Sequence, residues 1–147
     1  MIKVAIIGLG IMGRRMLQHM RIHEKFEPNY LWDPDKTACQ KAIEIDSEAK
    51  IMNSPEEAID AADLVYLACP PQVREAHAIQ TAQKGKALFL EKPLGIDIDH
   101  SKSLINKLKG FNVPLAVNFT QAAGPALNDL IKAKSAGELG EMIGVDI

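Results

Sequence analysis

The opening of the chain joins a short apolar run to a glycine pattern that few folds can use. Residues 2–7 read Ile-Lys-Val-Ala-Ile-Ile, a mostly β-branched run typical of a parallel strand that is buried on both faces. Gly8, Gly10 and Gly13 follow in the spacing G-x-G-x-x-G. Residues 14–25 then carry their apolar side chains at helical spacing. The sequence therefore predicts a strand that turns sharply into a helix.

Each glycine of this turn has a physical reason. Gly8 allows the tight turn, Gly10 lets a pyrophosphate approach the backbone, and Gly13 lets the helix pack close to the strand. The free amides and the positive dipole end of the helix then face the anion. The pattern predicts a dinucleotide cofactor site that includes these glycines and the intervening Ile11 and Met12.

An acidic residue follows at the distance that such a site requires. A second apolar strand is predicted at residues 29–32, and Asp33 comes directly after it, 20 residues beyond Gly13. In dinucleotide folds an acid at this place binds the ribose hydroxyls and repels a 2′-phosphate, which favours NAD. NADP stays an alternative, because Lys36 and Arg14 could offset the repulsion. A plain glycine turn followed by a solvated Asp33 is the other interpretation.

Composition bounds the class of protein. A length of 147 residues allows one domain with a real core, and a net charge of −2 gives no basic field for nucleic acid or an anionic membrane. The two cysteines, Cys39 and Cys69, lack metal-ligand spacing, which fits a reducing compartment without structural zinc. The four histidines also lack metal-ligand spacing and are expected at the surface or in packing: His19, His23, His77 and His100.

The start of the chain is the one segment that could mimic a targeting signal. Lys3 precedes the apolar residues 4–12, but Arg14 and Arg15 follow them in place of a small-residue cleavage site. The chain also has no run of about 18 apolar residues that could span a membrane. We therefore expect no membrane partner, no metal and a cytoplasmic location.

Strands and helices alternate along the rest of the chain. Ser54 is expected to cap a short helix, with Pro55 at its first position and Glu57 closing a capping box. The alternation predicts an α/β fold, a doubly wound parallel sheet of the Rossmann dinucleotide-binding type. The other predicted elements are helix 35–45, strand 51–52, helix 58–61, strand 63–69, helix 72–83, strand 87–90, a helix capped by Asp97 or Asp99 and running to Leu108, and strand 114–117.

The glycine motif and three further motifs carry a resemblance to a known family. They are Gly8-Leu9-Gly10-Ile11-Met12-Gly13, Cys69-Pro70-Pro71, Lys84-Gly85-Lys86 before Glu91-Lys92-Pro93-Leu94, and Ser135-Ala136-Gly137-Glu138-Leu139-Gly140-Glu141. With them the chain resembles the glucose–fructose oxidoreductase, inositol dehydrogenase and rhizopine-catabolism (Gfo/Idh/MocA) family over nearly all of its 147 residues. The first motif also opens the hydroxyisobutyrate and 6-phosphogluconate dehydrogenases, but these lack the Glu-Lys-Pro element and the Gly-Glu-Leu-Gly-Glu ending.

The resemblance implies a division of the chain. Residues 1–120 would form the NAD(P)-binding Rossmann domain, and residues 121–147 would be a connecting helix and the first strand of a truncated C-terminal substrate domain. Members of the family carry a second α/β domain that supplies the substrate pocket and usually an Asp and a His for proton transfer. The second domain is thus expected to be largely missing, and the chain alone to be inactive.

The resemblance also assigns roles in the loop after the strand at residues 87–90. The lysine of the family's Glu-Lys-Pro motif lies beside the nicotinamide and the substrate, so Lys92 is the expected catalytic residue and a cofactor contact. It would polarise the substrate hydroxyl or relay its proton. Glu91 is expected to orient the loop through hydrogen bonds, and Pro93 to fix the turn, with a cis or trans bond left open. A solvated lysine after a strand is the alternative.

Further family positions lie after the strand at residues 63–69. By resemblance, Pro70 and Pro71 would line the ribose and nicotinamide side, with Cys69 as a small packing residue at the strand end. Two positions depart from the family pattern. Arg74 stands where a His is frequent, and Ala122 stands where an Arg is frequent. The second change removes a positive group near the expected substrate cleft and so disfavours an anionic substrate.

The leading hypothesis is the cofactor-binding portion of an NAD(P)-dependent oxidoreductase. It would transfer hydride between the nicotinamide and a sugar, polyol or related hydroxyl compound, and the full-length protein is expected to form a homo-oligomer. A non-catalytic dinucleotide-binding sensor is the alternative from another class, and a hydroxyisobutyrate-type dehydrogenase is a second alternative. A short-chain dehydrogenase with a Tyr-x-x-x-Lys motif is disfavoured, because neither Tyr30 nor Tyr66 has a lysine four residues later.

Overall fold

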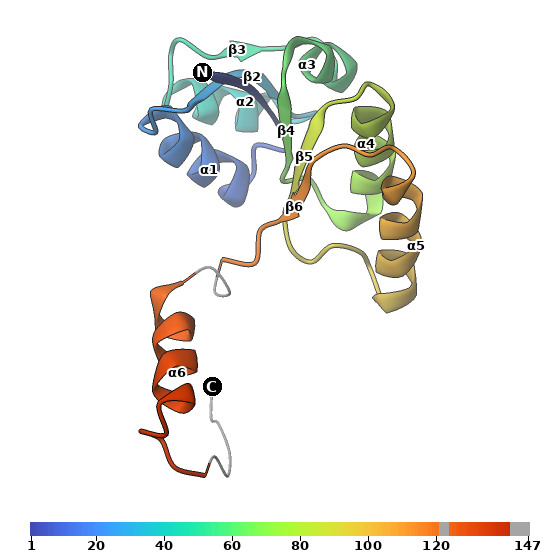
Figure 1. Cartoon of the computed structure of the whole chain (residues 1–147). Helices are drawn as coiled ribbons and strands as arrows, with labels where there is room; N and C mark the ends of the chain where they lie inside the picture. The colour runs from blue at the N-terminus through green and yellow to red at the C-terminus, as the bar shows by residue number, and fades with distance from the viewer. Residues whose placement is uncertain (121–123, 142–147) are drawn as a thin grey trace.

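A single parallel sheet organises the chain. The structure, a computed structural model, describes residues 1–120 and 124–141. Its six strands lie in the order β3-β2-β1-β4-β5-β6, which confirms the predicted doubly wound Rossmann sheet (Figure 1). The strands are β1 (Ile2–Ile7), β2 (Phe26–Trp32), β3 (Lys50–Ile51), β4 (Leu64–Leu67), β5 (Ala87–Leu90) and β6 (Leu115–Val117).

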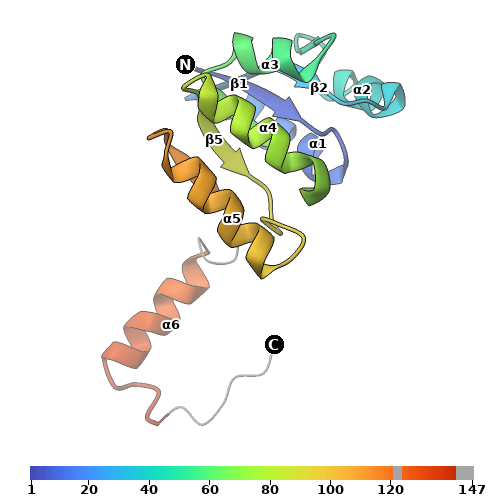
Figure 2. The ribbon, with the colours of Figure 1, turned by 90° about the vertical axis from the view of Figure 1, so that its right-hand side faces the viewer.

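Helices connect the strands and cover both faces of the sheet. One buried cluster joins the sheet to α3, α4 and α5, and a second joins it to α1 and α2. Figure 2 shows α4 and α5 passing in front of the sheet and α1 lying behind it. The helices are α1 (Ile11–Arg21), α2 (Lys36–Ile43), α3 (Pro55–Ala61), α4 (Pro71–Gln83), α5 (Ile98–Lys109) and α6 (Pro125–Ser135).

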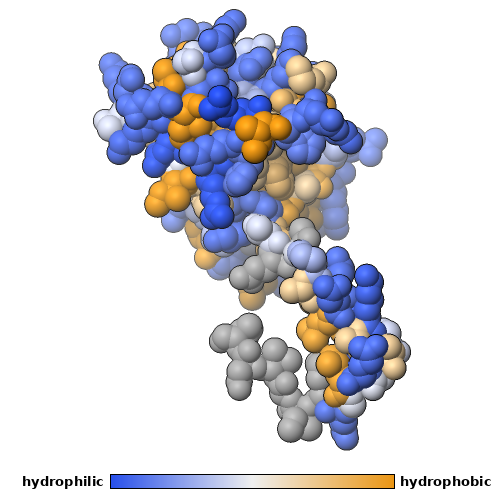
Figure 3. Space-filling model, turned by 90° about the vertical axis from the view of Figure 1, so that its left-hand side faces the viewer, coloured by the Kyte–Doolittle hydropathy of each residue, from blue (hydrophilic) through white to orange (hydrophobic). Residues whose placement is uncertain are grey.

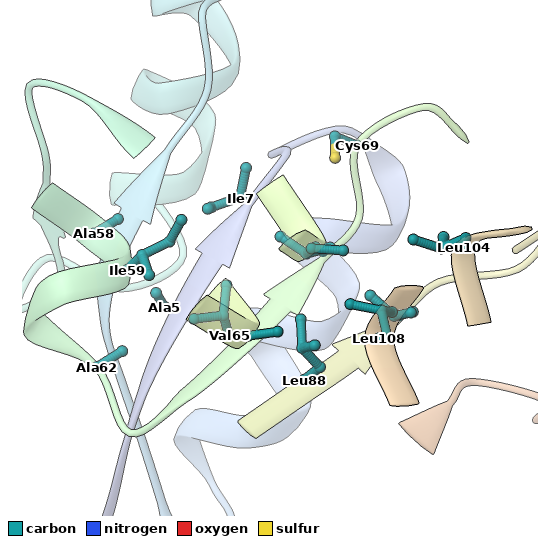
Figure 4. Packing of buried hydrophobic residues seen from close by; sticks show 14 residues of the cluster. Ala5, Ile7, Ala58, Ile59, Ala62, Val65, Cys69, Leu88, Leu104 and Leu108 are labelled. Atoms are coloured by element: carbon teal, nitrogen blue, oxygen red, sulfur yellow. The ribbon is translucent and has the colours of Figure 1, made fainter. Parts of the chain in front are cut away.

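Strand β1 lies in the middle of the sheet, and its sequence explains why. Val4 and Ile6 pack against α1 and α2, whereas Ala5 and Ile7 pack against the α3 side, and all four are fully buried. Successive side chains of a strand point to opposite faces, so a strand covered on both faces needs a continuous apolar run. Figure 4 shows Ala5 and Ile7 among the cluster that also contains Ile59 of α3.

Two predicted starts were wrong, because backbone hydrogen bonds set them. Helix α1 begins at Ile11 and not at residue 14, since the amide of Arg14 already donates to the carbonyl of Gly10 at 3.1 Å. Strand β2 begins at Phe26 and not at residue 29. Its pairing with β1 passes through an irregularity that accommodates Pro28, as expected for a proline inside a paired strand.

The other predicted elements match within a few residues. A strand was predicted at residues 63–69, but β4 ends at Leu67. Cys69 therefore lies in the turn before α4 and not in the strand. Ser54 caps α3 as predicted, but the carboxylate of Glu57 accepts from the amide of Asn53 and not from that of Ser54. Asp97 or Asp99 was predicted to cap α5, and Asp97 is the N-cap residue.

Helix α6 confirms that residues 121–147 contain a helix. It lies apart from the sheet in Figures 1 and 2, and none of its residues is buried. Figure 3 shows hydrophobic side chains exposed on it among hydrophilic ones. The large hydrophobic residues exposed on this helix are Leu127, Leu130 and Ile131. Ala122 and the strand predicted to begin a second domain near Ile147 lie outside the described residues.

Gly13→Ala is expected to lower the free energy of unfolding by about 2 kcal/mol or more. Its Cβ would lie 1.9 Å from the carbonyl oxygen of Gly8, so α1 would have to move off β1. Urea denaturation followed by circular dichroism measures the effect. Gly110→Ala is the matched control, because its Cβ would meet no atom closer than 3.6 Å. Equal destabilisation by the two substitutions would contradict this account.

Candidate functional site

The turn between β1 and α1 is built from close backbone contacts. Gly8 has a φ of +95°, and a Cβ there would lie 2.5 Å from the amide nitrogen of Cys69. A Cβ on Gly13 would collide with Gly8 itself. The turn is therefore pressed against both the segment that follows β4 and the first turn of α1. Two of the three predicted glycine roles have a direct steric reason in the structure.

Gly10 differs from these two glycines, because a Cβ on it would meet no atom within 4 Å. It is the N-cap residue of α1 and makes no side-chain capping hydrogen bond, and the first turn of the helix holds no acidic residue. The helix start therefore has no capping side chain, and the first turn places no acid of its own at the positive end of the helix dipole. This open cradle has the chemistry of an anion site and fits a dinucleotide pyrophosphate.

Asp33 lies at the end of β2, directly beside the glycine turn. One carboxylate oxygen accepts a hydrogen bond from the amide of Leu9 at 2.6 Å, and the other accepts from the amide of Asp35 at 2.8 Å. The amide of Gly8 donates to the carbonyl of Trp32 at 2.9 Å and makes a second link between the turn and β2. A carboxylate has about four acceptor sites, so Asp33 can still bind hydroxyl groups.

Arg14 contacts the glycine turn. Its guanidinium donates at 2.6 Å to the carbonyl of Leu9, the residue whose amide donates to Asp33. The sequence offered Arg14, together with Lys36, as a group that could offset repulsion of a 2′-phosphate. In the structure the hydrogen-bonding capacity of Arg14 is directed at the turn, and Lys36 is exposed at the start of α2.

Glu91 follows β5 and is almost completely buried, with 3% of its surface exposed. One carboxylate oxygen accepts from the hydroxyl of Tyr66 at 3.2 Å and from the side-chain amide of Asn118 at 3.0 Å. The other accepts from the backbone amide of Lys92 at 2.7 Å. Burial, and then the negative charge of Glu91, raise the pKa of the Tyr66 hydroxyl, so this hydroxyl stays protonated and donates.

Lys92 and Pro93 complete the loop at the carboxyl end of β5. The peptide bond between them is cis. Lys92 lines a cleft of about 660 Å³, a volume typical of small-molecule sites. The other lining residues come from α1 and from the segment after β6: Met12, Arg15, Met16, His19, Asn118, Phe119 and Thr120. The structure thus brings Lys92 to the same cleft as Met12 of the glycine motif.

Arg74 is a buried charged residue for which the sequence pattern predicted no function. It lies on α4 with only 2% of its surface exposed. Its guanidinium donates to the carbonyl of Cys69 at 3.1 Å from Nε and 2.6 Å from Nη2, and Nη1 donates to the carbonyls of Glu91 and Pro93. Burial lowers the pKa of Arg74, and the charge of Glu91 opposes this shift.

A sequence signal for this burial did exist. Arg74 shares the buried face of α4 with Ala78, Thr81 and Ala82, which lie four, seven and eight residues further along the chain. These are the spacings of one face of a helix. A charged residue on an otherwise small and apolar face indicates a side chain that hydrogen-bonds inside the protein.

The remaining candidates have structural surroundings. Pro70 is the N-cap residue of α4, and Pro71 begins the helix. Both therefore follow the carboxyl end of β4, at the same edge of the sheet as the cleft. The ring of His77 packs edge-on against Trp32 at 6.0 Å, and His100 pairs with Glu75. Among the residues described, no cluster of His, Cys, Asp and Glu could hold a metal ion. No helix in residues 1–120 or 124–141 combines the length and apolarity of a membrane span.

These features define a class of protein. A six-stranded doubly wound sheet, an open glycine cradle at the first helix and an acid at the end of β2 make up a dinucleotide-binding domain. Residues 2–119 match the model of an oxidoreductase family described by its NAD-binding Rossmann fold. The chain belongs to the Gfo/Idh/MocA oxidoreductase family, and the matched region is its NAD-binding domain.

Individual relatives agree with this assignment. The scyllo-inositol 2-dehydrogenase (NAD(+)) of Bacillus subtilis is 30% identical over 149 residues, covering 97% of this chain and 42% of that protein. The crystal structure of myo-inositol 2-dehydrogenase from Lactobacillus plantarum has a TM-score of 0.84 at 22% identity and covers 97% of this chain and 43% of its own.

A third comparison includes a cofactor. The scyllo-inositol dehydrogenase of Lactobacillus casei with bound NAD(H) and scyllo-inositol has a TM-score of 0.84 at 16% identity, and the match covers 95% of this chain and 42% of that one. The chain therefore spans less than half the length of the relatives it matches here.

The thiol of Cys69 is expected to react slowly with disulfide reagents, as a packing residue should and a reactive cysteine should not. Only 6% of its surface is exposed, and burial raises the pKa of its thiol despite the nearby charge of Arg74. In a Cys39→Ser variant, where Cys69 is the remaining cysteine, an aromatic disulfide reagent should react at least about tenfold faster in denaturant than in buffer. Equal rates in the two solutions would mean that the thiol is accessible and reactive.

Proposed function

We propose that this chain is the cofactor-binding part of an NAD(P)-dependent oxidoreductase that acts on the CH–OH group of a sugar, polyol or related compound. The observation that carries the proposal is the position of three features at one edge of the sheet. The open cradle at Gly10, the carboxylate of Asp33 and the side chain of Lys92 all follow the carboxyl ends of strands or the turn beside them. Open α/β sheets bind their ligands at this edge.

The residues divide naturally along a bound dinucleotide. The amides of the glycine turn, with Ile11 and Met12, would hold the pyrophosphate, and Asp33 would accept hydrogen bonds from the adenosine ribose. The nicotinamide half would then lie toward β4 and β5. The residues proposed to contact that half are Cys69, Pro70, Pro71, Glu91, Lys92 and Pro93.

Lys92 is the proposed catalytic residue. A bound nicotinamide supplies the hydride acceptor or donor, and the protein must place the substrate and move one proton. An ammonium group beside the substrate hydroxyl would stabilise the charge that develops on its oxygen. The cleft lined by Lys92 has the size of a small-molecule site, and the inositol dehydrogenases among the relatives act on polyols by name.

The proposal also covers the rest of the protein. Residues 1–120 would form the cofactor domain, and residues 121–147 would lead into a substrate domain. Exposed apolar residues on α6 support this division, because an isolated helix rarely leaves such a face in water: Leu127, Leu130 and Ile131. Assembly into a homo-oligomer and a cytoplasmic location stay predictions.

A non-catalytic dinucleotide sensor is the second candidate, since such a module would use the same cradle. The presence of Lys92 in the cleft favours the oxidoreductase over the sensor. A sensor requires no ammonium group in the cleft beside the cofactor, whereas hydride transfer to or from a hydroxyl compound benefits from one. The family match removes support from the hydroxyisobutyrate-type alternative.

Titration of the chain with NADH, followed by calorimetry, tests the proposal. Saturable binding is expected in the wild type, and Gly10→Ala should weaken it by about tenfold or more, because a methyl group would occupy the space next to the pyrophosphate. The melting temperature should change little, since that Cβ meets no protein atom. Gly110→Ala is the remote control. Absence of wild-type binding at millimolar NADH would overturn the proposal.

Asp33→Asn tests the preference for NAD over NADP. The substitution removes the negative charge but leaves an oxygen that can accept from the amide of Leu9. The ratio of NADPH to NADH affinity should therefore rise by about tenfold or more. Asp35→Asn is a matched control, because it removes a charge two residues away while keeping an oxygen that caps α2. An unchanged ratio in Asp33→Asn would show that its carboxylate does not select the cofactor.

A further inference from the structure

Arg74 joins two segments that lie at the carboxyl edge of the sheet. One is the turn between β4 and α4, reached through the carbonyl of Cys69. The other is the loop after β5, reached through the carbonyls of Glu91 and Pro93. Cys69 lies 5 residues before Arg74, and Glu91 and Pro93 lie 17 and 19 residues after it, so a single side chain links two separate segments of the chain.

The two loop carbonyls flank Lys92 on both sides. Arg74 therefore holds the carbonyls of the residues before and after the lysine, while the carboxylate of Glu91 accepts the hydrogen bond of the lysine amide. Only the side chain of Lys92 is left to extend into the cleft. The backbone position of the proposed catalytic residue is thus determined by one buried cation and one buried anion.

Arginine suits this task better than other residues. Its planar guanidinium has five N–H donors in a fixed arrangement, so it can serve several carbonyls at once. A lysine has three donors on a flexible stem and cannot reach all of these carbonyls in one geometry. Because Arg74 is buried, each lost bond also leaves a carbonyl or a charge without a partner inside the protein.

We propose that Arg74 is a positioning residue that holds Lys92, and with it the wall of the nicotinamide end of the cofactor site. The inference rests on the proposed function, since it concerns the same site. Arg74 acts on the nicotinamide half, whereas the glycine cradle and Asp33 would hold the adenosine diphosphate half. A residue that merely stabilises the fold would affect both halves alike.

The test compares two ligands that differ by the nicotinamide. NADH and ADP-ribose are titrated into the 147-residue chain, its Arg74→Met variant and its Arg74→Lys variant by calorimetry. Arg74→Met should weaken NADH binding by about tenfold or more and change ADP-ribose binding by less than about twofold. Arg74→Lys should lie between wild type and Arg74→Met for NADH, because the charge and part of the hydrogen bonding remain.

Thr81→Val is the matched control. Thr81 is fully buried on the same face of α4, and its hydroxyl donates to the carbonyl of His77, within the helix. This variant should lose thermal stability and keep the wild-type ratio of NADH to ADP-ribose affinity. Should Arg74→Met fail to fold, Arg74→Lys and the same ratio decide the question.

The outcomes separate the two proposals. A parallel loss of both ligands in the Arg74 variants, or no loss of either, would overturn the positioning role and leave the proposed function intact. Wild-type chain that binds ADP-ribose but not NADH would overturn the proposed function together with the positioning role, because the nicotinamide cofactor itself would not be bound. Wild-type chain that binds neither ligand would overturn the proposed function, and the positioning role with it.

Discussion

The close approach of the first helix to the first strand is the constraint on which the rest of the structure depends. A Cβ on Gly13 would lie 1.9 Å from the carbonyl oxygen of Gly8, and one on Gly8 would meet the backbone after β4. This contact directs the first amides of α1 at the edge of the sheet, where Gly10 leaves the approach open. The same geometry sets the packing of the core and the place where an anion can bind.

The local part of this architecture was predictable from sequence. Strand β5 was predicted with its observed bounds, because the apolar run at residues 87–90 ends at a polar break that the structure also uses. Backbone hydrogen bonds decided the two element starts that were missed. The start of β2 depends on its pairing with β1 around Pro28, and a proline normally argues against a paired strand when only the sequence is visible. The start of α1 depends on the carbonyl of Gly10, which no side-chain pattern reports.

The site divides in the same way. The glycine cradle, Asp33 and the Glu-Lys-Pro loop could be located from spacing and resemblance, since each lies at a strand end. The hydrogen-bond partners of these residues could not be predicted from the sequence. Asp33 reaches back 24 residues to the amide of Leu9, and Glu91 reaches 25 and 27 residues to Tyr66 and Asn118. Such pairs depend on strand order and on the facing of individual side chains, which local periodicity does not specify.

These long-range bonds give the site its order before any ligand binds. At one end Asp33 and Arg14 hold Leu9 from its amide and its carbonyl, and at the other Arg74 and Glu91 hold the backbone around Lys92. Loops restrained in this way lose less conformational entropy on binding, so more of the contact energy is available for affinity and alignment. The arrangement also explains why charged side chains are buried here. Arg74 satisfies three backbone carbonyls, and Glu91 satisfies one backbone amide and two side chains.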